Sequence, residues 1–268
     1  MKLELLSHTP DGGSPRPPLL FVHGAYVGAW CWAEYFLPFF ASRGYEAHAV
    51  SLRGHGASPG RDTLNAAGID DYVEDAVVAA RELGRAPVLI GHSMGAIVVQ
   101  RAARRCKARA MILMAPVPPH GLGGSLLSLV LRDPPLYFAL NALQFGAADV
   151  PSLRRIRDYL FSESITEAEV SRYLRRTQQE SQRVLLELSW PQHFWIASSI
   201  GVPALVLGAN NDAFFTTAMI DEAARFHGVS PRIFANMAHV MMLEPGWNEV
   251  ATHIDAWLAR TLTLSSSD

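Results

Sequence analysis

The sequence predicts an α/β fold, with a mostly parallel central sheet flanked by helices and an inserted helical cap. Short apolar runs bounded by turn residues alternate with longer segments of helical periodicity along most of the chain. Runs that are apolar throughout are typical of strands buried on both faces, as in parallel sheets covered by helices. From about residue 119 to residue 200 the helical pattern continues without a convincing strand. This interval predicts a helical insertion between two strands.

The expected elements follow from these patterns. We expect strands at residues 19–22, 46–52, 87–90, 111–115, 204–207 and 232–234, and an edge strand at 2–6. We expect core helices at residues 32–42, 69–83, 96–108, 217–226 and 247–262. Within the insertion we expect helices at 125–131, 136–145, 152–160, 167–177 and 179–188. The core domain is therefore predicted to comprise residues 1–118 and 201–268, and the cap residues 119–200.

Length and composition suit a protein with one sizeable core. The chain has 268 residues, of which 49% are hydrophobic and 18% charged, and its net charge is −2. This charge balance favours neither nucleic acid nor an anionic membrane as partner. The N-terminus lacks the apolar run of a signal peptide, and no run reaches the roughly 20 residues of a membrane span. With Cys31 and Cys106 in different contexts, we expect a reduced, cytoplasmic protein without integral membrane association.

The most informative motif is Gly-His-Ser-Met-Gly at residues 91–95. An apolar run precedes it and an apolar-faced helical segment follows, so Ser93 lies at a sharp turn between a strand and a helix. This pattern is the nucleophile elbow, in which small neighbours permit the turn and the serine hydroxyl is exposed above the sheet. Ser58 fits the same expression, but Pro59 follows it and offers no N–H to an oxyanion. We therefore predict Ser93 as the nucleophile and Ser58 as a loop residue.

A nucleophilic serine requires a base and a group that orients the base. His239 follows the last predicted strand by a short loop, which is where a base would face the elbow. Asp212 follows the penultimate strand, whereas the turn after the strand at 111–115 contains no carboxylate. We predict Asp212 as the orienting acid, with Glu244 as its most serious rival. The order serine, aspartate, histidine is the one expected for an elbow of this kind.

An oxyanion formed on Ser93 needs two backbone N–H donors. Met94 supplies one, because it is the first residue after the nucleophile. We expect Ala25 to supply the second, since Gly24 lets the loop after the strand at 19–22 turn close to the serine. The mechanism implied by these groups needs no metal and no organic cofactor.

With these residues placed, the chain resembles the α/β-hydrolase superfamily from about residue 17 to residue 260. The loop Ser-Leu-Arg-Gly-His-Gly-Ala-Ser at residues 51–58 is typical of many such hydrolases. Residues 23–32, His-Gly-Ala-Tyr-Val-Gly-Ala-Trp-Cys-Trp, are similar to the corresponding segment of plant methylesterases and hydroxynitrile lyases. The lyases carry a lysine directly after the catalytic histidine, and Val240 occupies that position here. This difference argues against cyanohydrin cleavage, and Ser93 excludes the mechanisms of relatives with an aspartate nucleophile.

The cap is rich in large apolar residues, which would provide an apolar roof above the site. Such a roof favours an acyl chain or an aromatic group over a sugar or a charged substrate. Our candidates for substrate binding are Tyr26, Leu126, Phe138, Leu186, Trp190 and Val240. The alternative for any one cap residue is that it only packs within the cap or against the core.

These observations predict a serine hydrolase that cleaves small carboxylic esters through an acyl-enzyme. A thioesterase, an acyltransferase, a perhydrolase or a carbon–carbon bond hydrolase would use the same machinery. A ligand receptor with little turnover is a further alternative on this scaffold. The sequence does not identify the physiological substrate, the natural acceptor of the acyl group, the cap residues that line the cleft or the oligomeric state.

Overall fold

A seven-stranded sheet runs through the protein in the computed structural model, which describes residues 1–192 and 201–264 without the side chains of 125–129 and 263–264. Its strands are β1 (Leu5–His8), β2 (Leu19–Val22), β3 (Ala47–Val50), β4 (Val88–His92), β5 (Ala110–Met114), β6 (Ala204–Ala209) and β7 (Arg232–Phe234). They lie in the order β1-β3-β2-β4-β5-β6-β7. All neighbours pair in parallel except β1, which is antiparallel to β3 at the edge. The predicted fold class is confirmed.

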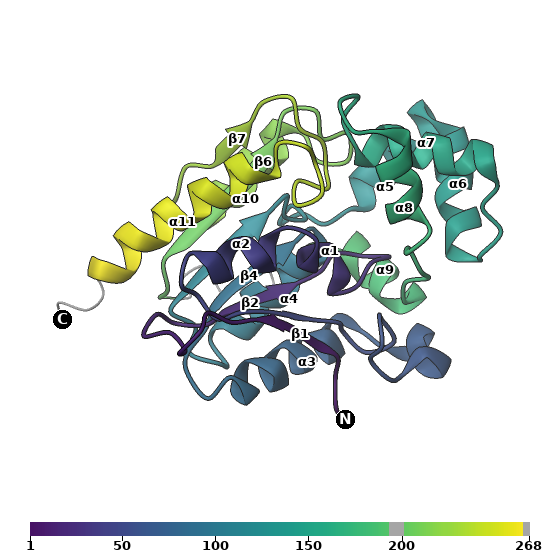
Figure 1. Ribbon diagram of the computed structural model, residues 1–268. Coiled ribbons are helices and arrows are strands. Elements are labelled where there is room, and N and C mark those ends of the chain that lie inside the picture. The colour runs from purple at the N-terminus through teal and green to yellow at the C-terminus, as the bar shows by residue number, and fades with distance from the viewer. Residues whose placement is uncertain (193–200, 265–268) are drawn as a thin grey trace.

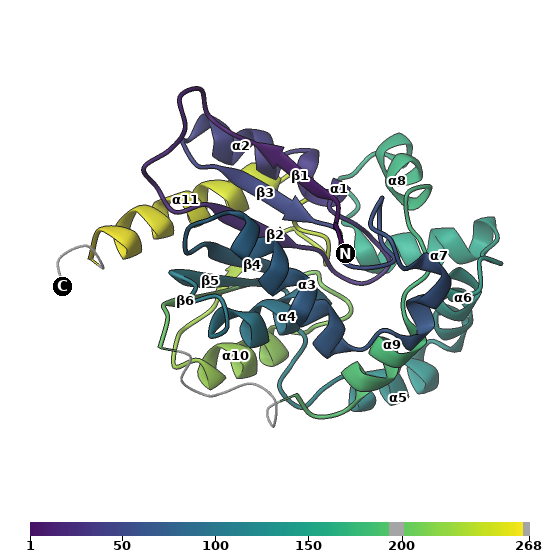
Figure 2. The same ribbon diagram turned by 90° about the horizontal axis from the view of Figure 1, so that it is seen from below.

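Helices cover both faces of the sheet. The core helices are α1 (Trp30–Ala33), α2 (Phe36–Ser42), α3 (Ile69–Glu82), α4 (Met94–Ala103), α10 (Thr217–Phe226) and α11 (Trp247–Leu264), with a 3-10 turn η1 at Arg61–Ala66. Figure 2 shows α2 and α11 on one side of the sheet and α3, α4 and α10 on the other. The strands β2, β4 and β5 lie between these layers and are buried along their whole length, and apart from His92 and Gly91 at the end of β4 their residues are apolar.

Among the described residues, five helices lie between β5 and β6 in the sequence, and they gather at one end of the molecule (Figure 1). They are α5 (Gly123–Arg132), α6 (Pro134–Gln144), α7 (Val150–Leu160), α8 (Glu167–Leu174) and α9 (Gln182–Ser189), and together we call them the cap. Side-chain oxygens of Asp133, Asp149, Thr166 and Ser181 accept hydrogen bonds from the first turns of α6 to α9. These N-caps explain where the helices begin, because each satisfies a backbone N–H that has no partner within its helix.

Local conformation differs from the sequence expectation at several elements: the edge strand expected at residues 2–6 spans Leu5–His8, and the helix expected at 167–177 ends at Leu174. The segment predicted as one helix at 32–42 is divided into α1 and α2, because Tyr35 leaves the helical region at φ −134°. The helix predicted at 96–108 begins earlier, at Met94, and ends at Ala103. The helix predicted at 179–188 begins at Gln182, since residues 178–181 bind the core instead of continuing the helix.

The core beside β2 is aromatic. The Phe21 ring lies 5.0 Å from the ring of Trp32 and 5.7 Å from that of Phe40, measured between centroids. All three side chains are fully buried, and burial of this much apolar surface stabilises the position of β2. Because the loop after β2 enters the candidate site, this packing also supports the site. Over the described part of the chain, no helix combines the length and apolar character needed to cross a membrane.

Candidate active site

Ser93 lies between the end of β4 and the start of α4, and its backbone has φ 52° and ψ −117°. A positive φ is sparsely populated by residues other than glycine, so the surrounding structure must hold it in place. A Cβ atom on Gly95 would come within 2.5 Å of the carbonyl oxygens of Val22 and His23, and one on Gly91 would collide with the backbone of Gly95. The two glycines of the motif are therefore required by close backbone contacts on both sides of the turn.

The loop after β2 passes next to the serine. A Cβ atom on Gly24 would lie 3.3 Å from the Cβ of Ser93, which is tighter than an ordinary contact, so the lack of a side chain at Gly24 lets this loop lie beside the elbow. Ala25 and Met94, the predicted oxyanion donors, line the same cavity as Ser93. The next residue, Tyr26, also has a positive φ, of 66°.

Asp212 and His239 meet across the loops that follow β6 and β7. The Nδ1 of His239 donates to Oδ2 of Asp212 at 2.8 Å, and both residues are buried. The other oxygen, Oδ1, accepts from the backbone N–H groups of Phe214 and Phe215 at 2.8 and 2.9 Å. This bonding fixes the proton of a neutral His239 on Nδ1 and leaves Nε2 as the acceptor that a general base needs. The structure thus brings together the predicted acid and the predicted base.

His239 and Ser93 line one cavity, although no hydrogen bond joins the hydroxyl to the imidazole within the described residues. The Nε2 of His92 donates to the backbone carbonyl of His239 at 2.9 Å, and the two rings lie 4.7 Å apart. Burial lowers the pKa of His92 well below its usual range, with His239 adding to the effect, so His92 stays neutral. Its side chain therefore supports the loop of His239.

The rival residues have structural contacts instead. The hydroxyl of Ser58 donates to the carbonyl of Ser51 at 2.5 Å and accepts from the N–H of Glu4 at 2.9 Å. Glu244 accepts from the N–H and the hydroxyl of Ser162 at 2.7 and 2.5 Å. Burial raises the pKa of Glu244 although the bonds from Ser162 oppose this. Ser58 thus joins loops, and Glu244 joins the core to the cap.

A cavity of about 230 Å³ extends from Ser93 to the underside of the cap. Its walls include Leu143 of α6, Ile156 of α7, Tyr173 of α8 and Leu188 of α9, so four cap helices contribute to it. Among the described residues that line it there is no Asp, Glu, Lys or Arg. A concave, mostly apolar space with few polar groups is typical of a small-molecule site.

The structure places the predicted substrate-binding residues differently from one another. Tyr26 and Val240 line the cavity. Phe138, Leu186 and Trp190 do not, because their side chains are 68%, 63% and 65% exposed on the outside of the cap. The side chain of Leu126 lies outside the described residues.

Helical periodicity explains the error at Phe138 and Leu186, whereas Trp190 lies just beyond the end of α9 in an extended conformation. An apolar pattern identifies an amphipathic helix, but it does not distinguish the face toward a cavity from an exposed one. The cavity residues of α6 and α9 are Leu140, Leu143, Leu185 and Leu188, which lie on other faces of the same helices. Sequence analysis also missed Trp30 and Cys31, although they belong to the segment that begins at His23.

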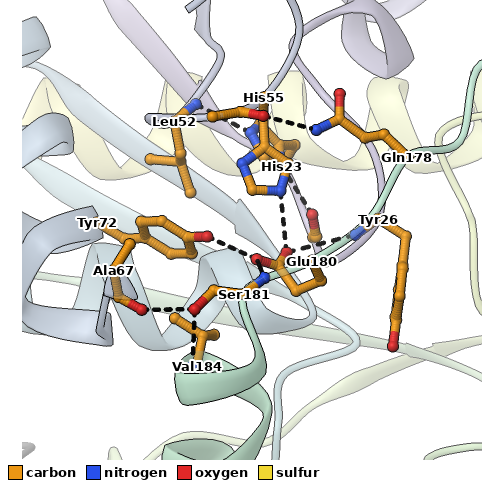
Figure 3. Close-up of polar contacts among 12 residues, drawn as sticks. His23, Tyr26, Leu52, His55, Ala67, Tyr72, Gln178, Glu180, Ser181 and Val184 are labelled. Carbon is orange, nitrogen blue, oxygen red and sulfur yellow. Dashed lines mark hydrogen bonds and ion pairs between the residues drawn. The ribbon is translucent and has the colours of Figure 1, made fainter. Parts of the chain in front are cut away.

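A buried polar cluster lies behind the loop after β2, and the sequence did not reveal it (Figure 3). His23 accepts from the N–H of Leu52 at 3.0 Å, and Glu180 bonds His55 at 3.2 Å and Tyr72 at 2.6 Å. Burial and the nearby His55 lower the pKa of His23 to about 3, so it is neutral. Burial alone would raise the pKa of Glu180, but the His55 ring and the hydrogen bonds it receives hold it below its usual value.

Comparison with known proteins places this geometry in context. Residues 19–251 match the sequence model of the alpha/beta hydrolase family. The chain is 34% identical over 137 residues to the probable esterase PIR7A of Oryza sativa subsp. indica, covering 48% of this chain and 49% of that protein. It is 37% identical over 89 residues to methyl jasmonate esterase 1 of Vitis vinifera, covering 32% and 33%. The chain thus spans about half the length, or less, of these curated relatives.

Solved structures share the fold over nearly the whole chain. An esterase (EaEST) from Exiguobacterium antarcticum has a TM-score of 0.75 at 14% identity, covering 96% of this chain and 95% of that one. The monoacylglycerol lipase of Paleococcus ferrophilus has a TM-score of 0.70 at 19% identity, covering 97% and 100%. At such identities the likeness concerns the fold.

The close approach at the elbow predicts the effect of Gly95→Ala. The added Cβ meets backbone oxygens that cannot rotate away, so we expect the free energy of unfolding to fall by about 1–3 kcal/mol. Urea denaturation measures it. The control is Gly124→Ala, because a Cβ on Gly124 meets nothing within 4 Å. Equal stability of Gly95→Ala and wild type would contradict the packing described here.

Proposed function

Because the chain belongs to the α/β-hydrolase family, we propose that it is a serine hydrolase that cleaves carboxylic esters through an acyl-enzyme. One observation carries the proposal: Ser93 and a His239 that is bonded to buried Asp212 line a single apolar cavity. The names of the similar proteins, among them esterases and a lipase, support the same reaction class. We retain the proposed division into a core of residues 1–118 and 201–268 and a cap of residues 119–200, and a cytoplasmic location.

In the proposed mechanism His239 takes the proton of the Ser93 hydroxyl through Nε2 while the serine oxygen attacks the ester carbonyl. Asp212 holds the imidazole in the tautomer this requires and stabilises the imidazolium that forms. His239 then protonates the leaving alcohol, which departs as the acyl-enzyme forms. Water, deprotonated by His239, attacks the acyl-enzyme and releases the carboxylic acid. No step uses a metal or an organic cofactor.

The N–H groups of Ala25 and Met94 are the proposed donors to the oxyanion. The close approach of Gly24 to Ser93 supports this assignment, because it brings the loop after β2 to the side of the serine. Donors fixed in a cavity with apolar walls act where the dielectric is low and need no reorganisation as charge develops.

The proposed substrate is a neutral ester with an apolar acyl or aromatic group. The cavity walls support this, since burying a charged group beside Leu143, Ile156 and Leu188 would cost free energy without a counter-charge. Tyr26 and Val240 are the proposed contacts near the reacting carbonyl. Thioesters, other acyl acceptors, peracid formation and carbon–carbon cleavage are alternatives on the same machinery, as is ligand binding with little turnover. Burst kinetics with p-nitrophenyl esters separate an enzyme from a receptor.

The nucleophile is tested with a fluorophosphonate probe. We expect the probe to label Ser93 in the wild type and to leave Ser93→Ala unlabelled. Ser58→Ala is the matched control, because Ser58 has the same motif but donates to the carbonyl of Ser51. It should be labelled like the wild type. A label found on Ser58 by peptide mass spectrometry, or retained by Ser93→Ala, would overturn the assignment.

The acid is tested by isosteric neutralisation. We expect Asp212→Asn to lower kcat by up to about 10⁴-fold, because the imidazole loses its tautomer and its counter-charge. Glu244→Gln serves as control, since Glu244 bonds Ser162 of the loop after α7. It should retain kcat within about tenfold, the ordinary range for a residue outside the reacting groups. A folded Asp212→Asn enzyme with near-normal kcat beside an inactive Glu244→Gln would reverse the two roles.

Substrate preference is tested with two ester series. We expect kcat/KM to be higher for medium-chain or aromatic acyl esters than for acetate, because the cavity provides apolar walls. At equal chain length, an acyl chain ending in a carboxylate should react more slowly than its hydrocarbon counterpart by more than about tenfold. A kcat/KM that is highest for acetate and falls steadily with chain length would show that the cavity does not bind the acyl group.

A further inference from the structure

A short segment of the chain between α8 and α9, residues 178–181, holds the backbone of Tyr26 from both sides. The N–H of Gln178 donates to the carbonyl oxygen of Tyr26 at 2.9 Å. The N–H of Tyr26 lies 3.4 Å from Oε2 of Glu180, to which it donates (Figure 3). Both main-chain polar groups of Tyr26 are therefore bonded to this segment rather than to the core domain.

These two bonds act on a residue with an unfavourable backbone conformation. Tyr26 has φ 66°, in the left-handed region that a bulky side chain adopts only when its surroundings determine it. Ala25, the proposed oxyanion donor, directly precedes it. The peptide plane between Ala25 and Tyr26 carries the N–H that Glu180 binds, so the position of Glu180 constrains the direction in which the Ala25 backbone turns.

Glu180 is itself held rigidly. It is fully buried, and its Oε1 accepts from the Tyr72 hydroxyl at 2.6 Å and the Ser181 N–H at 2.7 Å. Its Oε2 is bonded to His55 Nε2 at 3.2 Å, while Nδ1 of His55 lies 3.0 Å from the carbonyl of Arg53. Each ring nitrogen of His55 therefore faces an oxygen that can accept a hydrogen bond. A buried pair with satisfied bonding partners has a single arrangement.

Gln178 extends this link to a second loop. Its Oε1 accepts from the N–H of Gly56 and its Nε2 donates to the carbonyl of Gly54, both at 3.0 Å. On the other side, the Gln144 side chain of α6 bonds the backbone N–H and carbonyl of Glu180. Residues 178–181 are thus joined to the loop after β2, to the loop after β3 and to the cap.

We propose that Glu180 is a positioning residue for the oxyanion hole: its carboxylate fixes the backbone of Tyr26 and thereby directs the Ala25 N–H toward the reacting carbonyl. This inference rests on the proposed function, because it needs Ala25 as an oxyanion donor. If so, the arrangement of the oxyanion hole depends on a residue of the cap region and on its buried contacts with His55 and Tyr72, none of which lines the cavity.

The test variant is Glu180→Gln, which preserves size and removes the charge. An amide has one oxygen, so its NH₂ must face either the N–H of Tyr26 or the N–H of Ser181, and neither can accept. The matched control is Glu187→Gln in α9. Glu187 also joins this region to the core, by accepting from the Ile69 N–H at 2.7 Å, but it has no bond to the loop after β2.

We expect Glu180→Gln to lower kcat by about 10–100-fold with KM within about threefold, as expected when an oxyanion donor is misdirected rather than removed. The affinity for a trifluoromethyl ketone, which forms an oxyanion on the serine, should fall in parallel. Glu187→Gln should change kcat by less than about twofold, even where its thermal stability is lower. A general loss of stability would not lower kcat and the inhibitor affinity together while leaving KM nearly unchanged.

Two results would contradict the proposed role of Glu180. A folded Glu180→Gln enzyme with wild-type kcat, or one in which KM alone rises, would overturn the positioning role. If that variant does not fold, Tyr72→Phe removes one bond from Glu180 without touching Tyr26, and unchanged kcat there would overturn it too. Failure of wild-type Ser93 to react with a fluorophosphonate would instead refute the proposed function, and the role of Glu180 with it.

Discussion

The candidate site depends on one close approach, between the turn at Ser93 and the loop after β2. The positive φ of Ser93 persists because Gly91 and Gly95 let backbone atoms approach at distances that any Cβ would prevent. Adjacent parallel strands then bring Gly24 against Ser93. Phe21 of β2 packs against Trp32 and Phe40, and this packing supports the position of the loop beside the turn. The geometry proposed for catalysis is therefore a property of the two central strands.

The region between β5 and β6 does more than cover the cavity, because it bonds both loops that carry the proposed machinery. Glu180 and Gln178 hold the backbone of Tyr26 beside the proposed oxyanion donor. On the opposite side, the carbonyl of Leu160 accepts from the N–H of Val240 at 3.2 Å, and Ser162 bonds Glu244. A change in the position of the cap would thus be transmitted to the loop of His239 as well as to the loop of Tyr26.

The sequence predicted features that follow from local rules. The turn at Ser93 requires small residues at fixed offsets, and the loops of Asp212 and His239 each follow a predicted strand. The positions of these three residues in the fold could therefore be predicted from the sequence. Contacts between distant segments could not be predicted. The residues next to Glu180 in the sequence do not indicate that His55 will contact it. Likewise, the apolar periodicity of α6 does not show that Leu143 lines the cavity while Phe138 is exposed. Such contacts depend on how the cap packs against the core, which the pattern of apolar and polar residues in a single sequence does not specify.

Two buried carboxylates are held by the same physical rule. Asp212 accepts two backbone N–H groups on one oxygen and His239 on the other. Glu180 accepts two donors on each oxygen, including a backbone N–H at both. In a low-dielectric interior a carboxylate with an unbonded oxygen would favour protonation or attract water, so stability requires that each oxygen be bonded. The same bonds remove rotational freedom from the loops that donate them. Burial of charge and rigidity of the site are therefore two results of one arrangement.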